Sequence, residues 1–178
     1  MNEVTKIEPT SQAIFESERC YVRRFAESDL DAFVDYRNNV EWMKYQSFKG
    51  YSREEYKEFL LKEATLESGA QLAIIRKVDQ TLIGDVFIKK EDAIFWIGYT
   101  VHPSFKRQGY AFEIVQAMVE WIQQQGDYQI MAGVAVENSA SIQLLRKLKF
   151  TQVNEENGEL FFQFQKPYKN TLTIHEDV

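Results

Sequence analysis

Two periods of apolar residues run along the chain, and each predicts a different kind of element. From Ala111 to Ile122 the apolar positions recur at helical spacing, and Gly126 is placed to stop that helix. A second helix is expected from Ser139 to Lys149, where apolar residues again gather on one side.

Other apolar segments are too short for helices and have the length of strands. Three of them, 72–76, 81–89 and 93–101, are separated by turn-sized polar gaps and predict an antiparallel meander. Residues 129–136 form an almost continuous apolar run, which is typical of a strand covered on both faces. Residues 160–164 are expected to form a last strand.

The first third of the chain is expected to form a strand followed by two helices. Residues 19–25 form the strand. Each helix follows a capping-box pattern, a serine with a carboxylate three residues later: Ser28 with Asp31, and Ser52 with Glu55.

The ends of these helices and the order of elements complete the predicted fold. The first helix is expected to end near Asn38, and the second to run through Ala64 with Gly69 as its left-handed C-cap. The order β α α β β β α β α β predicts an α/β (α+β) fold, a mixed and mostly antiparallel sheet with helices packed on it.

The length of 178 residues, with 44% apolar and 27% charged positions, is that of one globular domain. Residues 1–17 mix polar and apolar types without a period, and 169–178 lack an apolar face, so both are expected to be poorly anchored extensions. The segment between them, 18–168, is predicted to be a single domain.

Charge and cysteine content narrow the function classes. A net charge of −6 argues against nucleic-acid binding and favours cationic or neutral partners. With no signal-type or membrane-spanning apolar run, the expected location is cytoplasmic, away from membranes. The single cysteine, Cys20, has no partners at metal-site spacing, so we expect no metal; it is either a nucleophile or a small buried residue.

The segment KRQGYA, Lys106 to Ala111, lies between an apolar strand and an amphipathic helix. A helix N-terminus presents unpaired N–H groups and partial positive charge, which suit an anion such as pyrophosphate. Gly109 allows close backbone approach, and Lys106 and Arg107 add positive charge. The alternative is an ordinary glycine-containing loop with solvated basic residues.

A second candidate segment is ENSASIQLLRKLKF, from Glu137 to Phe150. The opening turn of its helix brings Asn138 and Ser141 together beside the buried strand. Asn138 or Ser139 can equally be a helix cap, and a capping residue can also contact a ligand.

Together, IGYTVHPSFKRQGYA and ENSASIQLLRKLKF resemble the coenzyme-binding and following motifs of the GNAT N-acetyltransferases. Lys106 to Ala111 matches the pyrophosphate loop Q/R-x-x-G-x-G/A, with lysine at its first position and alanine at its last, and Gly109 stands at its glycine. The opening ERCYVRRFAESDLDAFVDYRNN, residues 18–39, is similar to the branch that acetylates ribosomal-protein N-termini, spermidine and some sugar amines. The resemblance covers about residues 18–166.

The resemblance implies a fold in which two central strands splay, with helices on both faces of the sheet. It also implies direct transfer of an acetyl group from acetyl-CoA to a primary amine, without a covalent enzyme intermediate. The coenzyme contacts that it implies are Tyr99, Thr100, Val101, Lys106, Arg107, Gln108, Gly109, Tyr110, Ala111, Asn138 and Ser141.

The chain departs from the family pattern at three positions. Leu145 stands where many members have a tyrosine general acid, so the resemblance passes proton donation to Ser141. Trp96 stands where related sequences often have a carboxylate before I-G-Y. Lys149 replaces the glycine that is common before Phe150, which affects only the local turn.

An ammonium acceptor must lose a proton before it can attack, so a base or a chain of waters is needed. Asp85 and Glu137 are the candidate carboxylates by position, and each is alternatively a solvated surface residue. His102 is a further candidate for accepting the proton; the alternative is that it is an ordinary loop histidine. The aromatic segment 39–51, with Trp42 and Tyr45 as candidate substrate contacts, either borders a substrate cleft or covers the sheet edge.

Three function classes remain open. The preferred hypothesis is an acetyl-CoA-dependent N-acetyltransferase. The rivals are a catalytically idle acyl-CoA-binding sensor, suggested by the missing carboxylate and tyrosine, and an interaction module whose aromatic segment binds a partner. The sequence does not separate a protein N-terminus, a polyamine, an amino sugar or an antibiotic as acceptor, nor a monomer from a homodimer.

Overall fold

The computed structural model describes residues 12–167. Residues 1–11 of the predicted N-terminal extension and the whole predicted tail, 169–178, lie outside this range. The expected domain boundary at residue 18 is corrected, because Phe15–Glu16 forms a strand, β1, and Phe15 is buried. The packed part of the chain therefore includes residues that sequence analysis assigned to a loose extension.

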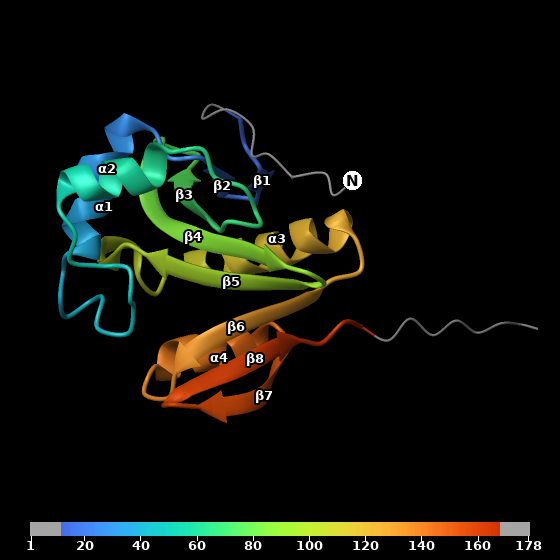
Figure 1. Cartoon of the computed structure of the whole chain (residues 1–178). Helices are drawn as coiled ribbons and strands as arrows, with labels where there is room; N and C mark the ends of the chain where they lie inside the picture. The colour runs from blue at the N-terminus through green and yellow to red at the C-terminus, as the bar shows by residue number, and fades with distance from the viewer. Residues whose placement is uncertain (1–11, 168–178) are drawn as a thin grey trace, which may run out of the picture.

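A single eight-stranded sheet organises the molecule, in the order β1-β2-β3-β4-β5-β6-β8-β7 (Figure 1). All neighbouring strands are antiparallel except β5 and β6, which are parallel. The predicted meander and the mixed, mostly antiparallel sheet are confirmed. The strands after β1 are β2 Cys20–Arg23, β3 Ala70–Arg76, β4 Thr81–Glu91, β5 Ile94–Val101, β6 Gln129–Ala135, β7 Phe150–Glu156 and β8 Glu159–Phe164.

Helices cover both faces of the sheet, as expected. Alternation along β3 divides the core, with Leu72 and Ile74 in one cluster and Ala73 and Ile75 in the other. The first cluster packs on the long helix α3 and on α4; the second packs on α1 and α2 (Figure 1). The helices are α1 Leu30–Arg37, α2 Arg53–Leu61, α3 Tyr110–Gln125 and α4 Ser139–Lys147.

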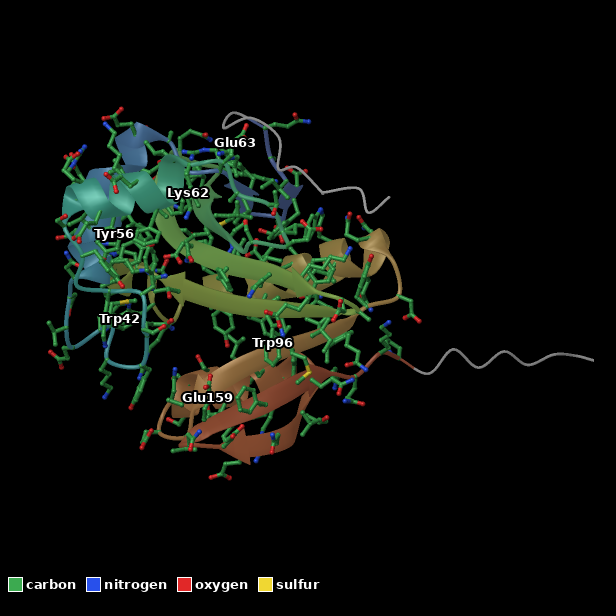
Figure 2. The ribbon with its side chains drawn as sticks, viewed as in Figure 1. Trp42, Tyr56, Lys62, Glu63, Trp96 and Glu159 are labelled. Atoms are coloured by element: carbon green, nitrogen blue, oxygen red, sulfur yellow. The ribbon has the colours of Figure 1, made fainter. Side chains whose placement is uncertain are left out.

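Strands β5 and β6 pair over a short stretch and then separate. Their register covers only Ile94 to Trp96 on β5, so residues 97–101 lie beside no β6 partner (Figure 1). Figure 2 shows Trp96 at this point, between the two strands, and its ring meets Phe161 edge-on at 6.0 Å. The splay that the family resemblance implied is therefore present.

The two capping predictions had different outcomes. Ser52 and Glu55 form the expected box, in which the hydroxyl of Ser52 accepts from the Glu55 N–H at 3.2 Å and the carboxylate of Glu55 accepts from the Ser52 N–H at 2.7 Å. The Ser28 box is wrong. A short 3₁₀ helix, Glu27–Asp29, precedes α1, and the Asp29 carboxylate accepts from the Ala26 N–H at 2.7 Å.

Three further expectations need correction. Helix α2 ends at Leu61, and Gly69 is not its cap but enters β3 with φ of +91°. Strand β6 is not covered on both faces: its buried and exposed residues alternate, and Gly133 is exposed. Strand β7 was not predicted because only Phe150 of its residues is buried, which leaves an edge strand without an apolar pattern.

Candidate active site

The splay of the sheet opens a cavity of about 380 Å³, which we call the β5–β6 cleft. Its walls are residues 97–99 of β5 and 132–135 of β6, and Asn138 and Ser141 close it at the start of α4. The β6 wall is built from small residues, so backbone groups of both strands lie close to the cavity. Such a wall suits an extended ligand that is held by main-chain hydrogen bonds.

The loop before α3 presents backbone donors and positive charge to solvent. Gly109 is the N-cap of α3 with φ of +80°, a conformation that favours glycine. The first helical bond runs from the Glu113 N–H to the Gly109 carbonyl at 3.1 Å, so the N–H groups before Glu113 have no acceptor within the helix. Lys106 and Arg107 are exposed beside them. This arrangement fits a phosphate-type anion.

A salt bridge that sequence analysis missed supports this loop. Glu113 lies in the first turn of α3, and its carboxylate accepts from Arg19 Nε at 2.6 Å and from the Ser17 hydroxyl at 2.7 Å. Burial alone would raise the pKa of Glu113, but the hydrogen bonds from Arg19 and Ser17 hold it below its usual value. The Arg19 guanidinium also lies 4.1 Å from the centroid of the Tyr110 ring. The negative charge of Glu113, in the first turn after this loop, is therefore offset by the positive charge of Arg19.

Asn138, Ser141 and Tyr99 meet at the inner end of the cleft. The Asn138 side chain accepts from the Ser141 N–H at 3.3 Å, so Asn138 is the cap of α4, and both residues also line the cleft. The Tyr99 hydroxyl is buried without a hydrogen-bond partner. Burial raises the pKa of Tyr99 to about 12, an effect that the nearby Ser141 hydroxyl partly offsets, although the two hydroxyls are not in hydrogen-bonding geometry.

A second cavity of about 430 Å³ lies on the β4 side of β5, next to α2. We call it the α2 chamber; it is lined by residues of β3, β4 and β5, by α2 and by the loops around α2. Gln46, Ser47, Gly98 and Tyr99 line both cavities. A ligand in the cleft and a second ligand in the chamber would therefore meet at Gly98 and Tyr99.

A family model for the acetyltransferase (GNAT) domain matches residues 19–151, well over half of the chain. The chain belongs to the GNAT acetyltransferase family. The match includes both the loop before α3 and the start of α4, the two segments on which the sequence resemblance rested.

Individual relatives agree with this assignment. The uncharacterized N-acetyltransferase YnaD of Bacillus subtilis (strain 168) is 25% identical over 135 residues, which are 74% of this chain and 79% of that protein. The ribosomal-protein-S5-alanine acetyltransferase of Vibrio fischeri superimposes with a TM-score of 0.68 at 20% identity, over 84% of this chain and 94% of its own. The Vibrio cholerae spermidine N-acetyltransferase, solved with CoA and spermine, gives 0.69 at 16% identity, over 82% and 93%. These similarities establish the GNAT fold.

Asp85 lies in the chamber wall, within a buried polar cluster. Its side chain is fully buried rather than solvated, and it accepts hydrogen bonds from Arg37, Tyr36 and Gln71. Burial alone would lower the pKa of Arg37, but the charge of Asp85 raises it above its ordinary value. Arg37 and Asp85 therefore form a buried ion pair that holds α1 against β4.

The other candidates lie apart from one another. Glu137 is exposed and lines neither cavity, although its backbone carbonyl accepts from the Tyr45 hydroxyl at 3.2 Å. Tyr45 lines the cleft rather than the chamber. Trp42 lines neither cavity; its Nε1 donates to the Val101 carbonyl at the end of β5, at 3.0 Å. His102 caps the short 3₁₀ helix after β5 by accepting from the Ser104 N–H.

Two remaining predictions concern residues outside the motifs. Cys20 is fully buried, and burial raises its pKa to about 11, which confirms its assignment to the core. Sequence analysis missed Glu159, an exposed carboxylate of β8 that lines the cleft above Gly133 (Figure 2). Its register opposite Ala135 places it there, and only the pairing of β6 with β8 reveals this.

Within residues 12–167, no cluster of three metal-ligating side chains is present. No helix in the same part of the chain is long and apolar enough to cross a membrane.

Proposed function

We propose that this GNAT protein transfers the acetyl group of acetyl-CoA directly to a primary amine. One observation carries the proposal: the β5–β6 cleft and the α2 chamber share a wall at Gly98 and Tyr99. A thioester in the cleft and an amine in the chamber are then brought within reach of each other without a covalent enzyme intermediate.

The chain has suitable groups for each part of the coenzyme. The N–H groups at the start of α3, with Lys106 and Arg107, bind the pyrophosphate. The pantetheine arm forms hydrogen bonds with the edge of β5 that has no β6 partner, at Tyr99, Thr100 and Val101. The opposing wall of β6, together with Asn138 and Ser141, encloses the thiol end. This assignment keeps every coenzyme contact implied by the sequence.

The chemistry requires one bond to form and one to break. The neutral amine nitrogen bonds to the thioester carbonyl carbon, β5 N–H groups stabilise the negative charge on the carbonyl oxygen, and the carbon–sulfur bond then breaks. Ser141 gives a proton to the departing thiolate. The attacking nitrogen gives up a proton as the amide forms, and that proton restores the Ser141 hydroxyl. Tyr99 also lines the cleft, and its raised pKa keeps its hydroxyl protonated at neutral pH.

The amine must first lose its own proton. Both oxygens of Asp85 are already occupied by the buried cluster, so we assign it a positioning role on Arg37 and Tyr36. Glu137 is exposed outside both cavities, and proton acceptance at Glu137 needs a chain of waters. Glu159 lines the cleft and not the chamber, so we propose that it accepts this proton through water where the two cavities meet.

Two measurements test the proposal. Acetyl-CoA at millimolar concentration is expected to raise the melting temperature, because a ligand that prefers the native state stabilises it. Thiol release is then measured with acetyl-CoA and a peptide N-terminus, a polyamine, an amino sugar and an aminoglycoside. An unchanged melting curve would reject coenzyme binding. Coenzyme binding without thiol release from a wide amine panel would support the acyl-CoA sensor instead.

A further inference from the structure

The α2 chamber contains more positive charge than its own residues neutralise. Its lining includes three cations, Arg24, Arg37 and Lys62, and one carboxylate, Asp85. Arg37 and Asp85 form the buried ion pair described above, so their charges offset each other. Arg24 and Lys62 remain as the net charge of the chamber.

Arg24 and Lys62 both line the chamber, and within residues 12–167 neither has a carboxylate as ion-pair partner. Nη2 of Arg24 donates to the backbone carbonyl of Lys62 at 2.9 Å, and the Lys62 ammonium lies 5.1 Å from the centroid of the Phe59 ring. Figure 2 shows Lys62 at the end of α2. Within residues 12–167, no carboxylate oxygen lies within 4.0 Å, the limit for an ion pair, of a side-chain nitrogen of Arg24 or Lys62. An anion bound at this end of the chamber would supply the counter-charge that both cations lack.

The rest of the chamber is largely apolar. Phe48, Phe59, Phe87 and Leu72 contribute to its lining, and the rings of Phe48 and Phe59 lie 5.6 Å apart. Its volume of about 430 Å³ falls within the range of small-molecule sites, which combine apolar walls with a few polar groups that fix orientation. The chamber therefore has one charged end, an apolar body and a reactive end at Gly98 and Tyr99.

We propose that the acceptor is an amine that also carries a carboxylate, namely an amino acid with a free α-carboxylate and an apolar side chain. The carboxylate binds Arg24 and Lys62, the side chain lies against the aromatic rings, and the amine faces Gly98 and Tyr99. This inference rests on the proposed function and narrows its acceptor. It also opposes the expectation drawn from the net charge of −6, because the local field at a site, rather than the total charge, selects a ligand.

The experiment compares acceptors that differ in one group. L-Phenylalanine, L-phenylalaninamide and spermidine are tested for acetyl-CoA-dependent thiol release. Phenylalanine is expected to exceed its amide at least tenfold in kcat/KM, and to exceed spermidine by more. In the double variant Arg24→Gln/Lys62→Gln, the advantage of phenylalanine over its amide in kcat/KM should fall to about one. The control Arg146→Gln/Lys147→Gln makes the same change in net charge on α4 and should keep the advantage.

A binding readout keeps the test independent of turnover. The product N-acetylphenylalanine should bind the CoA-loaded protein at least tenfold more tightly than N-acetylphenylalaninamide by calorimetry, and the double variant should lose this difference. Equal binding of the two, or a preference for spermidine, would overturn the inference while leaving the acetyltransferase proposal intact. Failure to bind acetyl-CoA at all would instead refute the proposed function, and the acceptor assignment with it.

Discussion

The two cavities on either side of β5 have different kinds of wall. The β5–β6 cleft is walled by strand backbone and by small residues such as Gly98, Ala132 and Gly133. The α2 chamber is walled by long charged and aromatic side chains, including Arg24, Lys62 and Phe59. Backbone walls suit a coenzyme that a whole family shares, whereas side chains can be exchanged to suit one acceptor. Under the proposed function, the cleft would bind the coenzyme common to the family, and the chamber would select the acceptor.

The largest expected effect is on the coenzyme side. Gly109→Glu should weaken acetyl-CoA binding by at least a thousandfold, about 4 kcal/mol, because it places a carboxylate at the pyrophosphate position. Calorimetric titration measures this. Gly50→Glu is the matched control, since Gly50 has the same φ of +80° and is also exposed but lines neither cavity. If both variants bind alike, the loop before α3 has been misassigned.

The next effect is on the wall of the chamber. Asp85→Asn leaves Arg37 buried without its counter-charge and should destabilise the fold by about 3–5 kcal/mol. For a chain of this size, that lowers the melting temperature by about 6–20 °C. The control Asp79→Asn breaks the ion pair between Asp79 and Arg76 at the surface and should change the melting temperature little. A variant with normal melting but lost turnover would show that Asp85 is a base and not a positioning residue.

At the junction of the cavities, Ser141→Ala should lower kcat by about ten- to a thousandfold with nearly unchanged acetyl-CoA affinity. Steady-state kinetics and calorimetry separate the two. Because the capping oxygen belongs to Asn138, the Ser141 variant should melt normally, whereas Asn138→Ala should cost about 1 kcal/mol. Full turnover by the Ser141 variant would move the general acid elsewhere, with Tyr99 as the first alternative.

The raised pKa of Tyr99, about 12, predicts a loss of stability in alkali. The unfolded chain ionises this tyrosine above about pH 10, while the folded protein keeps it protonated to about pH 12. Folded molecules thus hold the extra proton in this window, and stability falls as pH rises, by about 2–3 kcal/mol in all. Tyr99→Phe should flatten this fall, as measured by urea unfolding at pH 9, 10 and 11. Equal slopes for parent and variant would contradict the burial of the hydroxyl.

The smallest expected change in stability comes from Lys149, just beyond the C-terminal end of α4. Lys149 adopts φ of +68°, which explains why glycine is common there in the family pattern. Lys149→Gly should raise the free energy of unfolding by about 0.5–1 kcal/mol, since relief of the left-handed strain exceeds the entropy cost of glycine. A urea titration detects this change, and a loss of stability would mean that the lysine side chain makes a contribution of its own.

The sequence by itself determined the parts whose information is local. The apolar periods predicted the meander and α3, the Ser52 box predicted the start of α2, and the segment around Gly109 predicted the loop from which α3 begins. These features depend on residues within a few positions of one another, so their signal is continuous in the chain. The position of Asn138 and Ser141 at the opening of α4 was readable for the same reason.

Only the tertiary structure decided how distant segments combine. Arg19 and Glu113 are 94 positions apart, and Arg37 and Asp85 are 48 apart, so neither pair leaves a pattern in the sequence. The chamber is likewise assembled from a residue after β2 and another at the end of α2, Arg24 and Lys62. Local propensity fixes the elements, but burial and charge pairing between them fix the site, because these energies depend on which surfaces the packed sheet brings together.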